Sequence, residues 1–297
     1  MNIEYLSEER YSDFIEFCKK YRNNVDDSYL YEEDLKTFQP DEDNPTYIVL
    51  NDRSEIIAGV SLVKDSYYRR GKKGRFRIFH SAEPDRDIYE LMLQKIKPHT
   101  ADINEVFLFI QENNLAVREI FQSLQFTIER YAYFLTREAV EAEQPSLPED
   151  YSFKTFEFNQ DEEDYLYVRN AGFATLKGSE TPMTIEEVKK MGNDEDYIEG
   201  GIFLLYHREK PVGIVRSIRD SHNEEAVINI GPIALIPEYQ GKGLGRQLVR
   251  KALQFGKNIG LPKAVLSANA DNERAVHLYT KEGFKKEESL VCYHLIL

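Results

Sequence analysis

The stretch Ile228–Arg246, INIGPIALIPEYQGKGLGR, decides the fold of the second half of this 297-residue chain. Apolar residues typical of a buried strand run up to Pro237, a glycine-rich turn follows, and a helix is predicted from Gly245. Glycines between a strand and a helix let backbone N–H groups converge on one point, and the start of the helix adds partial positive charge there. The stretch therefore predicts a loop that binds phosphate groups, with a tight turn that binds no ligand as the alternative.

Three kinds of glycine-rich loop can follow such a strand. A Walker loop needs Gly-x4-Gly-Lys-Ser/Thr, but Gly243 follows Lys242, and Ile236 stands where the first glycine is required. A dinucleotide fingerprint needs Gly-x-Gly-x-x-Gly, and Arg246 occupies the place of its third glycine. The third pattern, Arg/Gln-x-x-Gly-x-Gly/Ala, is satisfied by Gln240–Gly245, QGKGLG.

A second motif follows this loop along the chain. It reads Asn272-x-x-Ala275-x-x-Leu278-Tyr279-x-x-x-Gly283-Phe284. With both motifs at this separation, the second half resembles the GNAT superfamily of acetyl-coenzyme A-dependent N-acetyltransferases, over roughly residues 151–297. The resemblance implies a mixed sheet, acetyl-coenzyme A as co-substrate and acetyl transfer to an amine.

The resemblance also assigns site residues. It implies that the strand around Leu235 separates from its neighbour beyond Pro232, so that its backbone pairs with the pantetheine arm and the Leu235 amide faces the acetyl oxygen. Tyr279 matches the family's tyrosine beside the departing sulfur, and Asn272 matches its contact to the pantetheine amides. The expected catalytic residues are Tyr279 and Leu235. The expected cofactor-binding residues are Ile233, Ala234, Leu235, Gln240, Gly241, Lys242, Gly243, Leu244, Gly245, Arg246, Asn272 and Tyr279.

Both motif side chains also have ordinary structural interpretations. Tyr279 shares one helical face with Ala275 and Leu278, as a core aromatic residue would. Asn272 stands at the start of a predicted helix, where an N-cap would serve equally well, and the two roles are compatible.

Local charge supports a phosphate site. The window Tyr239–Ala270 contains no Asp or Glu, although the chain has 52 acidic residues and a formal net charge of −14. This window predicts a positive surface suited to the phosphates of coenzyme A. The alternative is a solvated helix face. Its six basic residues are Lys242, Arg246, Arg250, Lys251, Lys257 and Lys263.

No general base can be assigned with the same specificity. His222, Glu224 and Glu225 precede the central strand, where a Glu acting through water is one interpretation and a hairpin-turn charge is the other. The histidines lack metal-ligand spacing and the chain has two cysteines, Cys18 and Cys292, so we expect neither a metal nor a disulfide framework.

The first half repeats the plan of the second. Shifted by 158 positions, Asn114 falls on Asn272, and the strand 106–110 falls on 264–268. Earlier, two apolar strands separated by a charged turn occur in both halves, 47–63 and 202–218, which is a hairpin signal. Tandem copies of one fold are therefore predicted, although a chance alignment is the alternative.

The first copy lacks the residues that the chemistry requires. After the strand 75–80 the sequence reads Ser81–Asp87, SAEPDRD, which has no glycine and three acidic residues. Phe121 replaces Tyr279, and Gln125 stands where the second half has Gly283. We expect this copy not to bind acetyl-coenzyme A. The layout resembles that of mycothiol synthase, a tandem member of the family, but no acceptor-site residues match, so its substrate is not carried over.

The expected architecture is α/β (α+β), with two tandem GNAT-like domains that each hold a central mixed sheet flanked by helices. The boundaries are set by Glu141–Asp150, EAEQPSLPED, in which two prolines block regular structure. The prediction is a degenerate domain over 1–140, a linker over 141–150 and a catalytic domain over 151–297.

Composition limits the other possibilities. The net charge of −14 argues against nucleic-acid binding and favours a cationic amine acceptor, with the solubility of a cytosolic protein as an equal alternative. No signal peptide or membrane span is apparent, so we expect a cytoplasmic enzyme without a membrane partner; the oligomeric state is not indicated. The alternative function is a non-catalytic acyl-coenzyme A sensor or interaction protein on the same fold.

Overall fold

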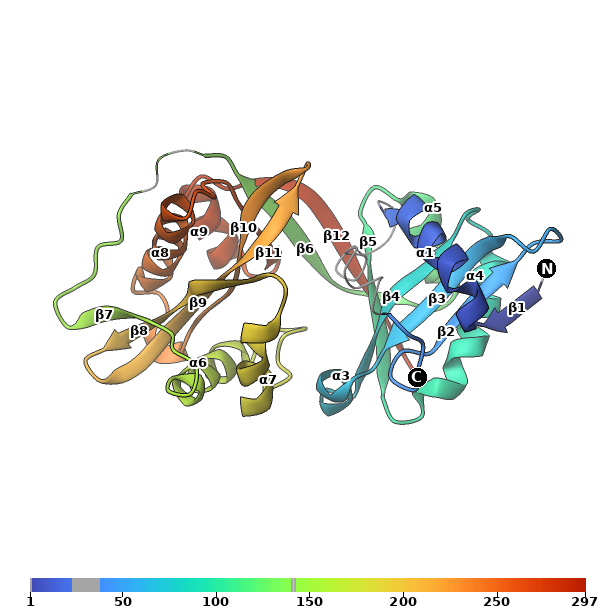
Figure 1. Cartoon of the computed structure of the whole chain (residues 1–297), viewed down its shortest axis with the longest axis horizontal. Coiled ribbons are helices and arrows are strands. Elements are labelled where there is room, and N and C mark those ends of the chain that lie inside the picture. Colours follow the sequence, from blue (N-terminus) through green and yellow to red (C-terminus); the bar gives the residue numbers. More distant parts are fainter. Residues whose placement is uncertain (1, 23–37, 140, 142) are drawn as a thin grey trace. The chain divides into compact units, whose positions relative to one another are not determined.

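The computed structural model describes residues 2–22, 38–139, 141 and 143–297, and the chain forms two compact units (Figure 1). Unit 1 comprises Met1–Tyr131 and Ser289–Leu297, and unit 2 comprises Ala132–Glu288. These bounds differ from the expected 1–140 and 151–297. The expected linker falls within unit 2, and its residue 142 lies outside the described part of the chain, as does residue 140 directly before it.

Unit 1 contains a mixed sheet in the order β1-β2-β3-β4-β5-β12. Neighbouring strands are antiparallel except β4 and β5, which are parallel and joined through α4. Its elements are β1 (Asn2–Tyr5), α1 (Tyr11–Lys20), β2 (Thr46–Leu50), β3 (Ile56–Val63), α3 (Ser66–Arg70), β4 (Lys73–Ser81), α4 (Arg86–Ile96), β5 (Glu105–Gln111), α5 (Leu115–Ser123), the start of β6 (Thr127–Arg137) and most of β12 (Lys285–Ile296).

Unit 2 repeats this arrangement in the order β6-β11-β10-β9-β8-β7. Here the parallel pair is β10 and β11, joined through α8, and the other pairs are antiparallel. The elements that follow β6 are β7 (Tyr151–Thr155), α6 (Glu162–Phe173), α7 (Ile185–Lys190), β8 (Tyr197–His207), β9 (Lys210–His222), β10 (Glu225–Leu235), α8 (Leu244–Asn258), β11 (Ala264–Asn269) and α9 (Glu273–Lys281).

Each unit takes its last strand from the other half of the sequence. β6 pairs with β11 over six positions, from Ala132↔Asn269 to Arg137↔Ala264. Correspondingly, β12 pairs with β5 from Leu290 to Ile296. β12, which lies in the range expected for the second domain, therefore completes the first unit instead. Hydrophobic alternation does not specify which edge a strand joins, because both edges present the same backbone groups.

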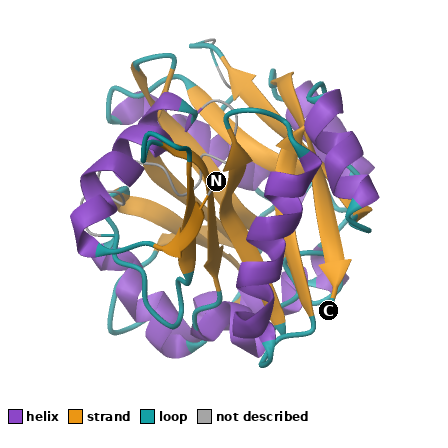
Figure 2. Cartoon of the chain, turned by 90° about the vertical axis from the view of Figure 1, so that its right-hand side faces the viewer, coloured by secondary structure: helices purple, strands orange, loops and turns teal. Residues whose placement is uncertain are grey.

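The sheet of unit 1 has helices on both faces (Figure 2). Alternate residues of a strand point to opposite faces. Ile48 and Leu50 join the core cluster of α1, whereas Val49 joins the cluster that contains α4 and α5 residues. Two apolar layers therefore hold α1 on one face and the pair α4 and α5 on the other.

In unit 2 the end of β10 lies between two helices. A Cβ at Gly172 of α6 would lie 2.9 Å from Ala234, and one at Gly245 of α8 would lie 3.8 Å from a methyl of Leu235. Ala234 and Leu235 point to opposite faces, so α6 and α8 cover opposite faces of this strand. These close approaches fix the strand end on which the site is built.

The expected fold class and elements are confirmed. Both units are mixed sheets with helices, and the hairpin over 202–218, the strand over 264–268 and the helices expected from Gly245 and from Asn272 are present. A capping box starts α7: Thr184 accepts from the Glu187 amide (3.4 Å), and the Glu187 side chain accepts from the Thr184 amide (2.8 Å).

Candidate active site

An opening between two parallel strands defines the candidate site in unit 2. The pairing of β10 with β11 is limited to two positions and ends at Asn229 and Val265. Both strands continue, β10 to Leu235 and β11 to Asn269. The sequence predicted separation beyond Pro232, and it begins earlier, directly after Asn229.

Backbone groups at the end of β10 face this opening. The Ile236 N–H donates to the Val212 carbonyl of β9 (3.0 Å). Hydrogen-bonded pairs alternate along an antiparallel ladder, so Ala234 also directs its N–H and C=O toward β9. Ile233 and Leu235 therefore direct theirs away from β9 and into the opening. The backbone of Ala234, predicted to contact the cofactor, is used within the sheet instead.

The predicted phosphate loop lies directly after this strand. Gln240 donates its side-chain amide to the Leu235 carbonyl (3.0 Å), which fixes the loop to the strand end. Gly241 (φ +74°) and Gly243 (φ +80°) adopt the left-handed conformation that favours glycine. No side chain caps α8, whose N-cap is Gly243. A Cβ at either of these glycines would meet open space, so the start of the helix is accessible to an anion.

Gly245 has a different role from its neighbours. A Cβ there would lie 3.2 Å from a methyl of Leu278 on α9, so this glycine allows α8 and α9 to approach each other closely. Leu244, predicted as a cofactor contact, is buried in the unit 2 core, so that only its backbone amide belongs to the first turn of α8.

A cationic and aromatic cluster beside the loop was not predicted. The Tyr239 hydroxyl is hydrogen-bonded to Nδ1 of His207 (2.9 Å). The Lys242 ammonium lies 4.7 Å from the centroid of the Tyr239 ring, and that of Lys210 lies 5.6 Å from it. These groups come from the β8–β9 turn and the loop, so no local sequence pattern could have joined them.

The expected positive surface is largely neutralised. Buried Glu282 accepts two hydrogen bonds from Arg250 (2.8 and 3.0 Å) and forms an ion pair with Arg246 (3.1 Å). Lys257 and Lys263 also pair with carboxylates from outside the window. The interpretation failed because acids distant in sequence fold back onto α8.

Tyr279 lies on α9 within unit 2 and is half-buried. Burial raises its pKa from 10.0 to about 12, because desolvation disfavours the phenolate. Among the described residues, its hydroxyl has no hydrogen-bond partner. The ring packs at a steep angle against Phe284, with centroids 6.1 Å apart. The side chain therefore combines a packed ring with an available, neutral hydroxyl.

Asn272 is the N-cap of α9, and its side-chain oxygen accepts from the Ala275 amide (3.2 Å). Asn114 caps α5 of unit 1 in the same way, by accepting from the Val117 amide (3.4 Å). The structural interpretation of Asn272 is therefore confirmed, and its side-chain amide remains a possible donor toward a ligand.

The three residues considered as bases lie far from the Leu235 end of the opening, where the acetyl group is expected. Glu225 begins β10 and Leu235 ends it, which at about 3.3 Å per residue is a separation of about 33 Å. Glu225 pairs with Lys263, and His222 pairs with Glu287 (3.1 Å). The hairpin-turn interpretation therefore holds for this group.

The corresponding opening in unit 1 is closed by the chain itself. β4 pairs with β5 only from Lys73 to Arg75, so the two strands separate here too. The Ser81 amide, which occupies the register position of Leu235, donates to the hydroxyl of fully buried Tyr89 (3.2 Å). Asp85 caps α4 by accepting from the Asp87 amide (2.9 Å). The backbone amide that an acyl group would need is therefore bound to Tyr89, and the helix start that a phosphate would need is capped by Asp85.

The described part of the chain contains no group of three or more His, Cys, Asp or Glu side chains that could hold a metal ion. Within the same residues, no helix combines the length and the apolar composition that a membrane crossing requires.

Comparison with known proteins agrees with this geometry. Residues 173–284 match the model of the acetyltransferase (GNAT) family. This stretch, which includes the opening, the loop and α9, is therefore similar to the acetyltransferase (GNAT) family.

Among curated proteins, the chain is similar to mycothiol acetyltransferases. It is 31% identical over 182 residues to that of Streptomyces coelicolor, covering 60% of this chain and 57% of that protein. For the Rhodococcus jostii protein the values are 26% over 185 residues, with 60% of each covered. The aligned part of the chain thus spans less than two thirds of these relatives' own length.

Solved structures share the fold over nearly the whole chain. A GCN5-related N-acetyltransferase from Sphaerobacter thermophilus has a TM-score of 0.74 at 13% identity, covering 99% of this chain and 95% of that one. A tandem GNAT protein from the clavulanic acid biosynthesis pathway has a TM-score of 0.71 at 11% identity, covering 99% and 98%. The tandem arrangement of the two copies is therefore a known one.

Proposed function

We propose that the chain is an N-acetyltransferase that moves the acetyl group of acetyl-coenzyme A to a primary amine at the opening of unit 2. The observation that carries this proposal is the pair of outward amides at Ile233 and Leu235 beside the uncapped start of α8. The strand amides offer hydrogen-bond donors to a carbonyl, and the start of α8 offers donors to phosphates.

The reaction is direct attack within a ternary complex. The neutral amine attacks the thioester carbonyl, a C–N bond forms, the C–S bond breaks, and the amine proton leaves to solvent or to the departing thiolate. The Leu235 amide stabilises the negative charge that develops on the carbonyl oxygen. The loop amides from Gly241 to Gly245, with Lys242, bind the pyrophosphate.

Tyr279 is the donor toward the departing sulfur in this proposal. Its pKa of about 12 lies well above that of an ordinary thiol, about 8.5, so full proton transfer is unfavourable. The hydroxyl therefore stabilises the thiolate by hydrogen bonding.

The function is tested by measuring coenzyme A release from acetyl-coenzyme A with a panel of primary amines. Turnover with at least one amine supports the proposal. Binding of acetyl-coenzyme A without turnover on any amine would instead support a non-catalytic sensor, and absence of binding would contradict both.

Replacement of Tyr279 by Phe should lower kcat about 10²-fold while leaving acetyl-coenzyme A affinity within about threefold. The hydroxyl meets charge that exists only as the sulfur departs, so its loss acts on the transition state. Steady-state kinetics and equilibrium binding separate the two effects. An unchanged kcat would show that Tyr279 serves only in packing.

The pH dependence of the reaction follows from the ionisation of the amine acceptor and of Tyr279. An ordinary alkylamine has a pKa near 10.4 and must lose its proton to attack, so kcat/KM should rise through pH 6–9. Tyr279 keeps its proton up to about pH 12, so it should cause no decline below pH 11. A falling limb near pH 10 that disappears in Tyr279→Phe would show that the phenol ionises normally.

A further inference from the structure

The cationic and aromatic cluster beside the phosphate loop of unit 2 lies against one fixed ring, that of Tyr239. The Tyr239 hydroxyl is hydrogen-bonded to Nδ1 of His207 (2.9 Å), and the Tyr151 ring stacks on His207 with centroids 4.6 Å apart and planes 25° apart. The ammonium groups of Lys242 and Lys210 lie 4.7 Å and 5.6 Å from the centroid of the Tyr239 ring. Two cations are therefore held together directly before the start of α8.

Neither of these two positive charges is compensated within the described ranges. No carboxylate there forms an ion pair with Lys210 or Lys242, although Glu209 and Glu238 stand beside the cluster in the sequence. The chain has a formal net charge of −14, and several cations farther along α8 are paired with carboxylates. Two unpaired ammonium groups at the start of the same helix therefore indicate a place for an anion.

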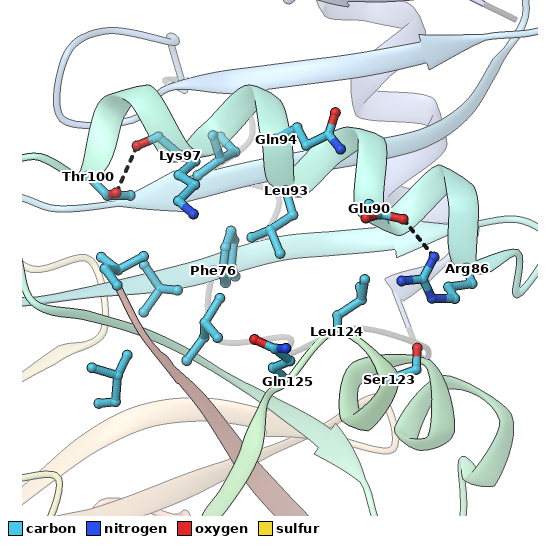
Figure 3. Close-up of a pocket in the computed structure, with 15 residues that line it drawn as sticks. Phe76, Arg86, Glu90, Leu93, Gln94, Lys97, Thr100, Ser123, Leu124 and Gln125 are labelled. Atoms are coloured by element: carbon cyan, nitrogen blue, oxygen red, sulfur yellow. Dashed lines mark hydrogen bonds and ion pairs between the residues drawn. The ribbon is translucent and has the colours of Figure 1, made fainter.

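The degenerate copy lacks this charge pattern. Lys210 closes the β8–β9 hairpin of unit 2, and Glu55 closes the corresponding β2–β3 hairpin of unit 1. At the start of α4, Figure 3 shows the Arg86 guanidinium against Glu90, at 2.6 Å. Unit 1 thus has a carboxylate in the place of Lys210, and the cation at its helix start is compensated.

The ligand that matches two cations beside one helix start has two separate phosphate groups. In coenzyme A, a single ribose carries the pyrophosphate on its 5′ oxygen and a phosphate monoester on its 3′ oxygen. Such a monoester has a charge of about −1.5 to −2 at pH 7. Because the pyrophosphate is assigned to the loop amides and Lys242, Lys210 is left for the second phosphate.

We propose that Lys210 binds the 3′-phosphate of coenzyme A and so makes the donor site selective for acetyl-coenzyme A over acetyl-dephospho-coenzyme A. His207 and Tyr151 are positioning residues, because they hold the Tyr239 ring against which Lys210 lies. The inference rests on the proposed function, and it adds a specificity that comes from outside both sequence motifs.

Calorimetric titration of the full chain with acetyl-coenzyme A and with acetyl-dephospho-coenzyme A tests the proposal. The native protein should bind acetyl-coenzyme A about tenfold more tightly, because the dephosphorylated donor lacks the group that accepts a charge-assisted hydrogen bond from Lys210. Equal affinities for the two donors would overturn this inference and leave the proposed function standing. Binding of neither donor would contradict the donor site itself, and the inference with it.

Lys210→Ala should remove this selectivity, with affinity for acetyl-coenzyme A falling about tenfold and affinity for acetyl-dephospho-coenzyme A changing less than about twofold. Arg208→Ala is the matched control, because it removes a positive charge from the same turn that is already paired with Asp150 (3.2 Å). The native ratio of the two affinities should persist in this variant. A purely structural role of Lys210 would weaken both donors equally, and that result, or an equal loss of selectivity in Arg208→Ala, would overturn the proposal.

Discussion

Gly243→Val should weaken acetyl-coenzyme A binding about 10³-fold. Gly243 has φ +80° and is the N-cap of α8, so a β-branched residue there would move the loop out of the left-handed conformation and place methyl groups where the pyrophosphate approaches. Loss of two hydrogen bonds to a charged group, at about 1.5–3 kcal/mol each, gives this magnitude. Equilibrium dialysis with labelled acetyl-coenzyme A measures it.

The control for this substitution is Gly260→Val. Gly260 follows the other end of α8, has φ +82°, and a Cβ there would also meet open space. Both variants should lose about 1–2 kcal/mol of stability through backbone strain, and Tm should fall by about 2–8 °C in each. Only Gly243→Val should lose affinity. Equal losses in the two variants, or none, would contradict the assignment of the loop.

A fragment of residues 132–288 should fold, whereas a fragment of residues 151–297 should not. The second fragment lacks the β6 segment, in which Leu135 is 1% exposed within the unit 2 core and Arg137 binds the Glu282 carbonyl. It also carries Val291 and Tyr293, which are fully buried in the core of unit 1. Its β11 edge would be unpaired and two large apolar side chains would lose their core.

Circular dichroism and thermal denaturation distinguish the two fragments. The 132–288 fragment should melt cooperatively and retain acetyl-coenzyme A binding, while the 151–297 fragment should aggregate or show no cooperative transition. A cooperative transition in residues 151–297 with a Tm equal to that of 132–288 would contradict the strand exchange.

The sequence could predict the elements and the loop because their signals are local. The spacing of Gln240, Gly243 and Gly245 describes one strand–turn–helix segment, and Asn272 stands beside the helix that it caps. The separation of β10 from β11 was expected from the family resemblance beyond Pro232. In the structure it starts earlier, directly after Asn229.

The remaining features depend on partners distant in sequence. β6 and β12 each pair with a strand that is distant in sequence, and no local pattern in either strand indicates which sheet it completes. Glu282 neutralises Arg246 and Arg250 although it lies outside their window. Tyr89 closes the opening of unit 1 by accepting a hydrogen bond from the Ser81 amide, and no pattern local to α4 indicates that contact.

The stoichiometry of acetyl-coenzyme A binding to the intact chain tests the central claim most directly, because the claim is that one copy holds a working site and the other is closed by its own side chains. Isothermal titration calorimetry should give one equivalent per chain for the native protein and no measurable binding for Gly243→Val. Two equivalents, or one equivalent that persists in Gly243→Val, would contradict the account.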